Sequence, residues 1–330
     1  MLATKYTRSA SEARLAAFNT SLAIITSETD PLDTLQRLLL RERRAGAKRN
    51  SSYLQSVQRD GMAASWRQKM SHWMFETGFA FEMAKDTVGC AINYMDQYLS
   101  LHSATKHNLQ LLSLVSLSAA SKMHESQPIS MDEMKVLSEN KFSRKELWQM
   151  EAQLMQALSW KLDPLTPFTF ARDLIASLAI QDTAAVLDSV MSFLQDVTED
   201  YASLCFSASS IAIAAVFVFT KSHSSDVMSS FASVLSSLEV DSSELIDCFH
   251  FLADFNHVKN HASPISVAEV TEVDGFSVAN SPCAVDSDLC DDLCSPVWAI
   301  DFYALLEKPV VEATVESDDC CPRSKKMRAN

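Results

Sequence analysis

The sequence predicts an all-α protein, and three observations support this prediction. The chain has 330 residues, 47% of them hydrophobic, which is enough for one large core or two of ordinary size. Its 5 glycines and 9 prolines are too few for the turns that many short strands would need. Good helix formers such as alanine, leucine, methionine and glutamate are plentiful, and apolar residues recur at helical spacing along most of the chain.

Residues 1–62 are expected to form an N-terminal extension with one amphipathic helix. Asp30, followed by a proline, is a helix-start signal, and the leucines after it repeat on one face. The basic run RERRAGAKR at 41–49 is either a nuclear-import or phosphate-binding patch or, as is usual for charge runs, the solvated end of this helix.

Residues 63–165 are expected to form a first helical domain. Its third helix is apolar on every side, which is typical of a helix surrounded by other helices. The periodicity predicts helices at residues 64–81, 86–101, 106–125, 130–138 and 144–158.

Residues 166–261 are expected to repeat this plan. The run SSIAIAAVFVF, about a hundred residues after the first central helix, is again apolar all round. The spacing suggests two copies of one helical unit, although any large helical protein has buried helices. The periodicity predicts helices at residues 167–178, 183–203, 207–221, 224–238 and 242–257.

Residues 262–330 are acidic and poor in periodicity, which predicts a flexible, disordered tail. Ser281 and Ser295 each precede a proline, so proline-directed phosphorylation could control turnover there, with recognition of the tail by a ubiquitin ligase. The basic end PRSKKMRAN is a second candidate import signal. We expect a nuclear protein that can shuttle to the cytoplasm.

Charge and composition exclude several classes of protein. A net charge of -14 argues against nucleic-acid binding, which needs a dense basic face, and favours protein partners. The eight cysteines form no CxxC pair, as expected for reduced thiols in an intracellular protein. The start of the chain lacks an apolar signal-peptide region, and the longest apolar run, 211–219, is about half of a bilayer span. We therefore expect a soluble protein with no membrane partner.

No catalytic motif is present. The chain has no GxGxxG, P-loop, GxSxG or HExxH sequence, and its scattered glycines could not build a phosphate cradle. His124 and Glu125 are adjacent in sequence and would point about 100° apart on a helix, so they predict no metal site. We expect neither an enzyme nor a cofactor.

Four charges stand in apolar surroundings. Arg67 and Asp96 lie on successive predicted helices, where burying either alone would be costly, so we expect them to form a structural ion pair. Lys122 ends the apolar third helix, where a cation suits the helix dipole, and Glu151 lies among apolar neighbours two helices later. On these facts alone, charges such as Lys122 and Glu151 are more often ordinary surface charges than parts of a site.

Four ordered blocks carry a resemblance to a known family. They resemble the cyclin box, most closely that of D-type cyclins, and the likeness covers about residues 35 to 260. The resemblance implies two tandem five-helix cyclin-box folds and a regulatory subunit that activates a cyclin-dependent serine/threonine kinase. The blocks are WRQKMSHWMFE (66–76), DTVGCAINYMDQYLSL (86–101), LQLLSLVSLSAASKMHES (109–126) and ELWQMEAQLMQALSWKLDPLTPFTF (146–170).

The resemblance also implies a binding site. The family positions that match Lys122 and Glu151 hold the regulatory C-helix of the kinase, whereas Glu125 would be a local structural charge. The positions of Arg67 and Asp96 pair inside the family's fold. Neighbouring apolar residues would pack on the kinase helix, namely Met123, Met155, Trp160 and Leu162.

Some residues depart from the family pattern. The family's docking patch for Arg-x-Leu substrates is apolar, but Lys69 places a charge in it, so ordinary docking is doubtful here. Gln97 replaces the family's arginine after the aspartate, and the Leu-x-Cys-x-Glu motif that binds retinoblastoma-type proteins is absent. The residues at the docking-patch positions are Trp66, Lys69, Met70 and Trp73.

Two functions follow from this resemblance. The first is a D-type-like cyclin that controls cell-cycle progression by activating a kinase. The second is a transcription-associated adaptor that uses the same fold without activating a kinase. The adaptor has no need of Lys122 and Glu151, so these two residues distinguish the hypotheses.

Overall fold

The computed structural model describes residues 30–46, 50–59, 61–178, 180–221 and 223–261. These residues form α-helices and one 3-10 helix, with no strand among them, which confirms the all-α fold class. Among the helices described, none is both long and apolar enough to cross a bilayer. Predictions for residues 262–330, including Ser281 and Ser295, lie outside the described residues.

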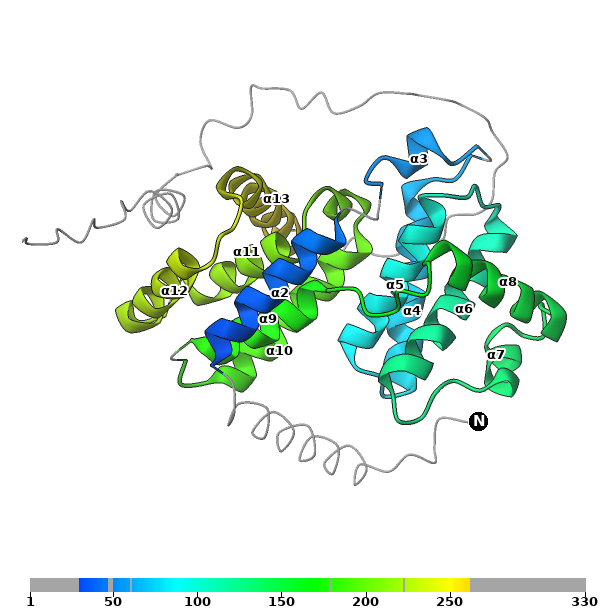
Figure 1. Ribbon diagram of the computed structural model, residues 1–330, viewed down its shortest axis with the longest axis horizontal. Helices are drawn as coiled ribbons and strands as arrows, with labels where there is room; N and C mark the ends of the chain where they lie inside the picture. The colour runs from blue at the N-terminus through cyan, green and yellow to red at the C-terminus, as the bar shows by residue number, and fades with distance from the viewer. Residues whose placement is uncertain (1–29, 47–49, 60, 179, 222, 262–330) are drawn as a thin grey trace, which may run out of the picture. The chain divides into compact units, whose positions relative to one another are not determined.

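The first bundle consists of the five helices α4 to α8, with α6 at its centre (Figure 1). Helix α6 is buried along most of its length, as expected for a helix that is apolar all round, and it contacts α4, α5 and α8. Helices α7 and α8 each begin with a capping box, in which Ser130 and Ser143 are the N-caps. The bounds are α4 Ala64–Ala80, α5 Lys85–Leu99, α6 Lys106–His124, α7 Met131–Leu137 and α8 Arg144–Ala157.

The second bundle repeats this plan around α11. Helix α11 is buried almost throughout and contacts α9, α10 and α13. The ring of Phe217 on α11 packs on Phe231 of α12 and on Phe249 of α13. The bounds are α9 Pro167–Ser177, α10 Thr183–Glu199, η1 Tyr201–Cys205, α11 Ala208–Thr220, α12 Ser225–Ser237 and α13 Ser242–His261.

Helix α2 (Pro31–Ala45) precedes the first bundle in sequence but packs on α9 of the second, as Figure 1 shows. Asp30 caps it by accepting a hydrogen bond from the backbone of Leu32. Leu35 and Leu39 are its buried residues. One face of the helix therefore completes the second bundle, and its arginines remain outside.

Three details differ from the sequence prediction, and one of them is α13, which runs to His261 and not to residue 257. The helix expected over 183–203 ends at Glu199, because Asp200 takes an extended conformation and its side chain accepts from Ala202, starting η1. A short helix, α3 (Tyr53–Ser56), was not expected; it places Tyr53 in the core. The domain boundaries at 62, 165 and 261 stay predictions.

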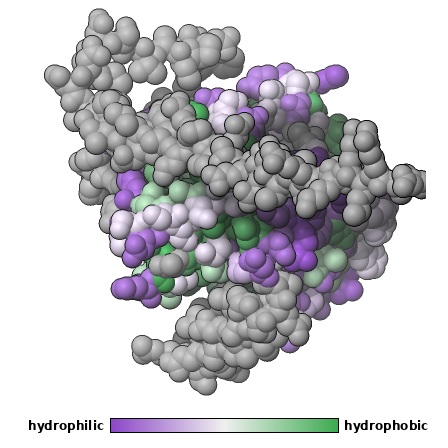
Figure 2. Space-filling model, turned by 60° about the vertical axis from the view of Figure 1, so that its left-hand side comes forward, coloured by the Kyte–Doolittle hydropathy of each residue, from purple (hydrophilic) through white to green (hydrophobic). Residues whose placement is uncertain are grey.

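Apolar patches and hydrophilic patches alternate on the face shown in Figure 2. Several large apolar side chains of the described residues remain exposed, whereas most such side chains are buried. They are Leu40, Phe79, Leu101, Met123, Val136, Trp148 and Trp160.

Candidate functional site

Lys122 and Glu151 meet at the surface of the first bundle. Lys122 lies in the last turn of α6 and Glu151 in the middle of α8, and the lysine Nζ is 2.5 Å from the Glu151 Oε1. The side chains are 43% and 29% exposed, so both charges can still reach an incoming partner. The buried helix α6 positions the backbone of Lys122, and the contact with Glu151 orients its ammonium group.

Exposed apolar side chains flank this ion pair along the chain. Met123 follows Lys122 and is 52% exposed, and Trp160, just beyond α8, is 73% exposed. Met155 is buried, and Leu162 is half-buried with its backbone oxygen bonded to the hydroxyl of Tyr94. Of the apolar residues predicted for the site, Met123 and Trp160 are thus the accessible ones.

Trp148 was missed by the sequence argument. It lies on α8 three residues before Glu151, which places it on the same helix face, and 58% of it is exposed. The exposure of Trp148 in the folded protein marks it as a candidate contact residue. The sequence could not show this, because the periodic apolar pattern is the same for an exposed tryptophan and a core tryptophan. We define the α6–α8 surface as Lys122, Met123, Trp148, Glu151 and Trp160.

The turn that presents Trp160 is strained. Ser159 and Trp160 have φ values of 50° and 59°, in the left-handed region that favours glycine. The backbone N–H of Trp160 donates to Met155 and closes the end of α8. A left-handed conformation in a residue other than glycine costs about 1–3 kcal/mol, and the backbone hydrogen bonds at the end of α8 hold the turn in it.

Glu125 has a different role from Glu151. Its Oε1 accepts from the backbone N–H of Ala84 at 2.9 Å and from the Thr87 hydroxyl at 2.7 Å. It therefore caps the first turn of α5, where a carboxylate also suits the helix dipole.

Arg67 and Asp96 form a buried, two-pronged ion pair. The guanidinium donates to both carboxylate oxygens at 2.8 and 2.9 Å, and the Tyr53 hydroxyl donates to the carboxylate at 3.1 Å. Burial opposes the charge on Arg67, but Asp96 outweighs it, so the pKa of the guanidinium is raised. Burial, aided by Asp96, also raises the pKa of Tyr53.

The same arginine links the two bundles. Its Nη1 donates to the backbone oxygens of Thr198 and Glu199 on α10, at 3.1 and 3.0 Å. Arg67 is therefore structural, and it is not accessible to a partner.

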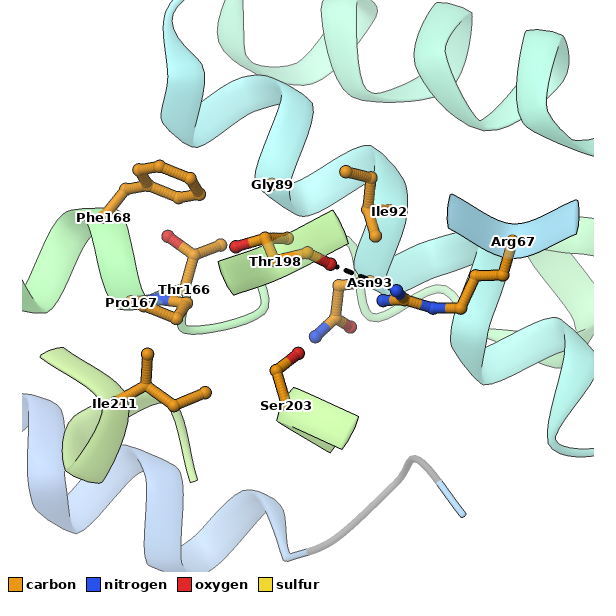
Figure 3. A pocket seen from close by; sticks show the side chains of 10 residues that line it. All are labelled: Arg67, Gly89, Ile92, Asn93, Thr166, Pro167, Phe168, Thr198, Ser203 and Ile211. Carbon is orange, nitrogen blue, oxygen red and sulfur yellow. Dashed lines mark hydrogen bonds between the residues drawn. The ribbon is translucent and has the colours of Figure 1, made fainter. Parts of the chain in front are cut away.

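Arg67 also borders a cavity of about 20 Å³, room for roughly one water molecule, between the bundles (Figure 3). Figure 3 shows side chains from α5, α9 and η1 facing this space. Its size excludes a substrate, and no group of residues suited to holding a metal occurs in the described part of the chain.

The predicted docking patch lies on α4. Trp66, Met70 and Trp73 are half-exposed and recur at helical spacing, so they share one stripe, and Lys69 beside them is exposed. The charge of Lys69 thus borders the apolar stripe. The prediction that Lys69 disfavours docking of Arg-x-Leu substrates stays a prediction.

Comparison with known proteins finds one matching family model and several similar proteins. Residues 33–163 match the family described as Cyclin, N-terminal domain. The chain is 30% identical over 169 residues to a putative cyclin-A3-1 of Arabidopsis thaliana, covering 50% of this chain and 47% of that protein. It is 32% identical over 131 residues to the G1/S-specific cyclin-D1 of Rattus norvegicus, covering 40% and 44%. The chain thus matches about half the length of these curated relatives.

A solved structure supports the fold. A viral cyclin from herpesvirus saimiri superposes with a TM-score of 0.58 at 18% identity, covering 67% of this chain and 95% of that one. At this identity the likeness concerns the fold alone. Residues 33–163 of this chain thus match a cyclin N-terminal domain, and the chain is similar in sequence to both A-type and D-type cyclins.

Proposed function

We propose that this protein is a D-type-like cyclin and that it binds and activates a cyclin-dependent serine/threonine kinase to control cell-cycle progression. The observation that carries the proposal is the surface ion pair of Lys122 with Glu151, flanked along the chain by exposed apolar residues. A pair of this kind can grip the backbone and charges of a foreign helix while tryptophan and methionine supply apolar contact.

The proposed mechanism is positional, and the cyclin performs no chemistry. Binding at the α6–α8 surface would rotate the kinase's C-helix inward, so that its glutamate reaches the lysine that orients ATP. The activation segment would move away from the substrate cleft at the same time. Such a stable interface buries roughly 2,000 Å² or more in total.

The test replaces both charges. We expect Lys122→Ala with Glu151→Ala to weaken kinase binding by about 2–5 kcal/mol, because kinase groups would remain buried without partners. The measurement is capture of the kinase from dividing cells, followed by a kinase assay on the captured material.

The matched control is Arg144→Ala with Asp132→Ala. This second pair also joins two helices of the first bundle, at 2.9 Å, but lies outside the α6–α8 surface. Unchanged capture by the Lys122 and Glu151 double variant would refute the site. Capture of a kinase that stays inactive would instead favour the adaptor function.

We also propose that the protein works in the nucleus and that Ser281 and Ser295 control its turnover. The basic runs at 41–49 and 322–330 and the two Ser-Pro sequences motivate this. A fluorescent fusion reports the location. An unaltered protein half-life after Ser281→Ala with Ser295→Ala would remove the turnover role.

A further inference from the structure

The small cavity beside Arg67 lies where the two bundles meet, as Figure 3 shows. The first bundle contributes residues of α4 and α5 to its walls, and the second bundle contributes residues of α9, α10, η1 and α11. Its volume of about 20 Å³ exceeds the roughly 10–15 Å³ that one water molecule needs, and it leaves no room for a second. A single water molecule is therefore the ligand that matches this volume.

Three polar side chains of the wall can form further hydrogen bonds. The Asn93 Oδ1 accepts from the Gln97 Nε2 at 2.5 Å, and this bond leaves the Asn93 Nδ2 available as a donor. The hydroxyls of Thr198 and Ser203 each donate to a backbone oxygen at 2.7 Å, so both hydroxyl oxygens can still accept. Figure 3 shows the Asn93 amide and the Ser203 hydroxyl facing the same space.

One water molecule complements these three groups. A buried water typically forms about three hydrogen bonds to the protein. In this cavity a water can accept from the Asn93 amide and donate to the oxygens of Thr198 and Ser203. Asn93 and Ser203 are only 9% and 5% exposed, and ordered water commonly completes the hydrogen bonding of polar groups as buried as these.

The polar walls distinguish this cavity from one that stays dry. Empty cavities in proteins are lined by apolar side chains. Asn93 also lines a larger hollow of about 430 Å³ whose rim includes the exposed Arg43 and Glu239, so a water molecule has a way in beside it. Five of the ten residues around the small cavity are polar, namely Arg67, Asn93, Thr166, Thr198 and Ser203.

We propose that this cavity is a binding site for one ordered water molecule that joins the two bundles. The water accepts a hydrogen bond from Asn93 of the first bundle and donates to Thr198 and Ser203 of the second. It thus adds a link between the bundles next to the one that Arg67 makes. The proposal does not depend on kinase binding by Lys122 and Glu151, so either one can fail alone.

The solution test counts long-lived water molecules in the full chain by oxygen-17 magnetic relaxation dispersion, which detects waters that tumble with the protein. Ser203→Val is expected to lower this count by about one, because the valine methyl groups take the space of the water and remove one of its acceptors. An unchanged count in a Ser203→Val variant with the helix content of the wild type overturns the proposal.

Thr198→Val tests the same site with a change that keeps the side-chain shape. It removes one of the three hydrogen bonds, so the water should remain bound but exchange several-fold faster than in the wild type. Thr220→Val is the matched control, because the Thr220 hydroxyl also donates to a backbone oxygen of its helix, at 2.8 Å, but does not line the cavity. Equal exchange rates in these two variants contradict the site, even if Ser203→Val fails to fold.

A high-resolution crystal structure of the full chain locates the water. We expect electron density for one water molecule within about 2.7–3.2 Å of polar atoms of at least two of Asn93, Thr198 and Ser203. A cavity without density, or a water that contacts only one of these residues, overturns the proposal.

Discussion

The buried charge of Arg67 is expected to dominate the stability of the first bundle. Arg67→Met leaves Asp96, which is 0% exposed, without its counter-ion, and removal of one partner of a buried pair costs about 3–5 kcal/mol. Urea unfolding measures this loss. Tyr53→Phe removes only one hydrogen bond to the same carboxylate and should cost about 1–2 kcal/mol, so an equal or larger loss for Tyr53→Phe would contradict the network.

Glu199 makes stability depend on pH. Burial raises the pKa of its carboxyl, an effect only partly offset by the hydrogen bond with His72. The folded state thus favours the neutral carboxyl, which stabilises the fold below the ordinary pKa, and this contribution is lost as the pH rises through the raised pKa.

Glu199→Gln is therefore expected to be more stable than the wild type at about pH 7, with a difference that disappears towards about pH 4. Urea unfolding at several pH values checks this. Glu76→Gln, an exposed change on α4, is the control. A Glu199→Gln advantage that grows on acidification would show that the sign is wrong.

Single residues also show the limits of sequence reasoning. Arg67, Asp96, Lys122 and Glu151 stand out in sequence because charges interrupt apolar helices. The burial of Gln97 does not stand out, because a polar residue on a helix is usually solvated. Its burial depends on segments that are distant in sequence, and only the folded chain brings these together.

At the scale of elements, helical periodicity predicted most helices well because each must bury one face. It missed α3, whose four residues are too short to show a period, and it ran α10 past Asp200 because apolar spacing continues into η1. The cap residues determine where these helices begin and end. A residue caps a helix only in a suitable backbone conformation, which the sequence pattern does not show.

The start of α9 is joined to α5. Thr166 caps α9 by accepting from the backbone of Thr169, and both threonine hydroxyls donate to the carboxylate of Asp86. Thr166→Val keeps the side-chain shape but removes this hydroxyl from a site that is 2% exposed. We expect a loss of about 1–2 kcal/mol in unfolding free energy.

Thr105→Val is the matched control for that change. Thr105 is also a threonine N-cap, at the start of α6, but it is exposed and accepts only from Asn108 in its cap. Its loss should be the smaller of the two in the same urea experiment. A larger loss at Thr105 would show that the contact with Asp86 does not stabilise the junction of the bundles.

At the scale of the whole molecule, the two bundles are expected to unfold together. Arg67 binds the end of α10, and Asp86 binds the start of α9, so neither bundle can unfold without breaking buried contacts of the other. In a Trp298→Phe background, tryptophan fluorescence reports the first bundle, which holds the remaining four tryptophans.

Far-UV circular dichroism reports the helices of both bundles. The midpoints from the two signals should coincide for this variant during urea unfolding. Two separated transitions would mean that the bundles are thermodynamically independent.

Helix α2 can dock only after the second bundle has been synthesised. It is made before the first bundle, yet its docking surface on α9 emerges about 120 residues later. At a translation rate of about 5–20 residues per second, roughly 10 s pass between the synthesis of α2 and the synthesis of α9. While the first bundle folds, the apolar face of α2 therefore stays exposed on the nascent chain. An exposed apolar segment of this kind is a binding site for chaperones.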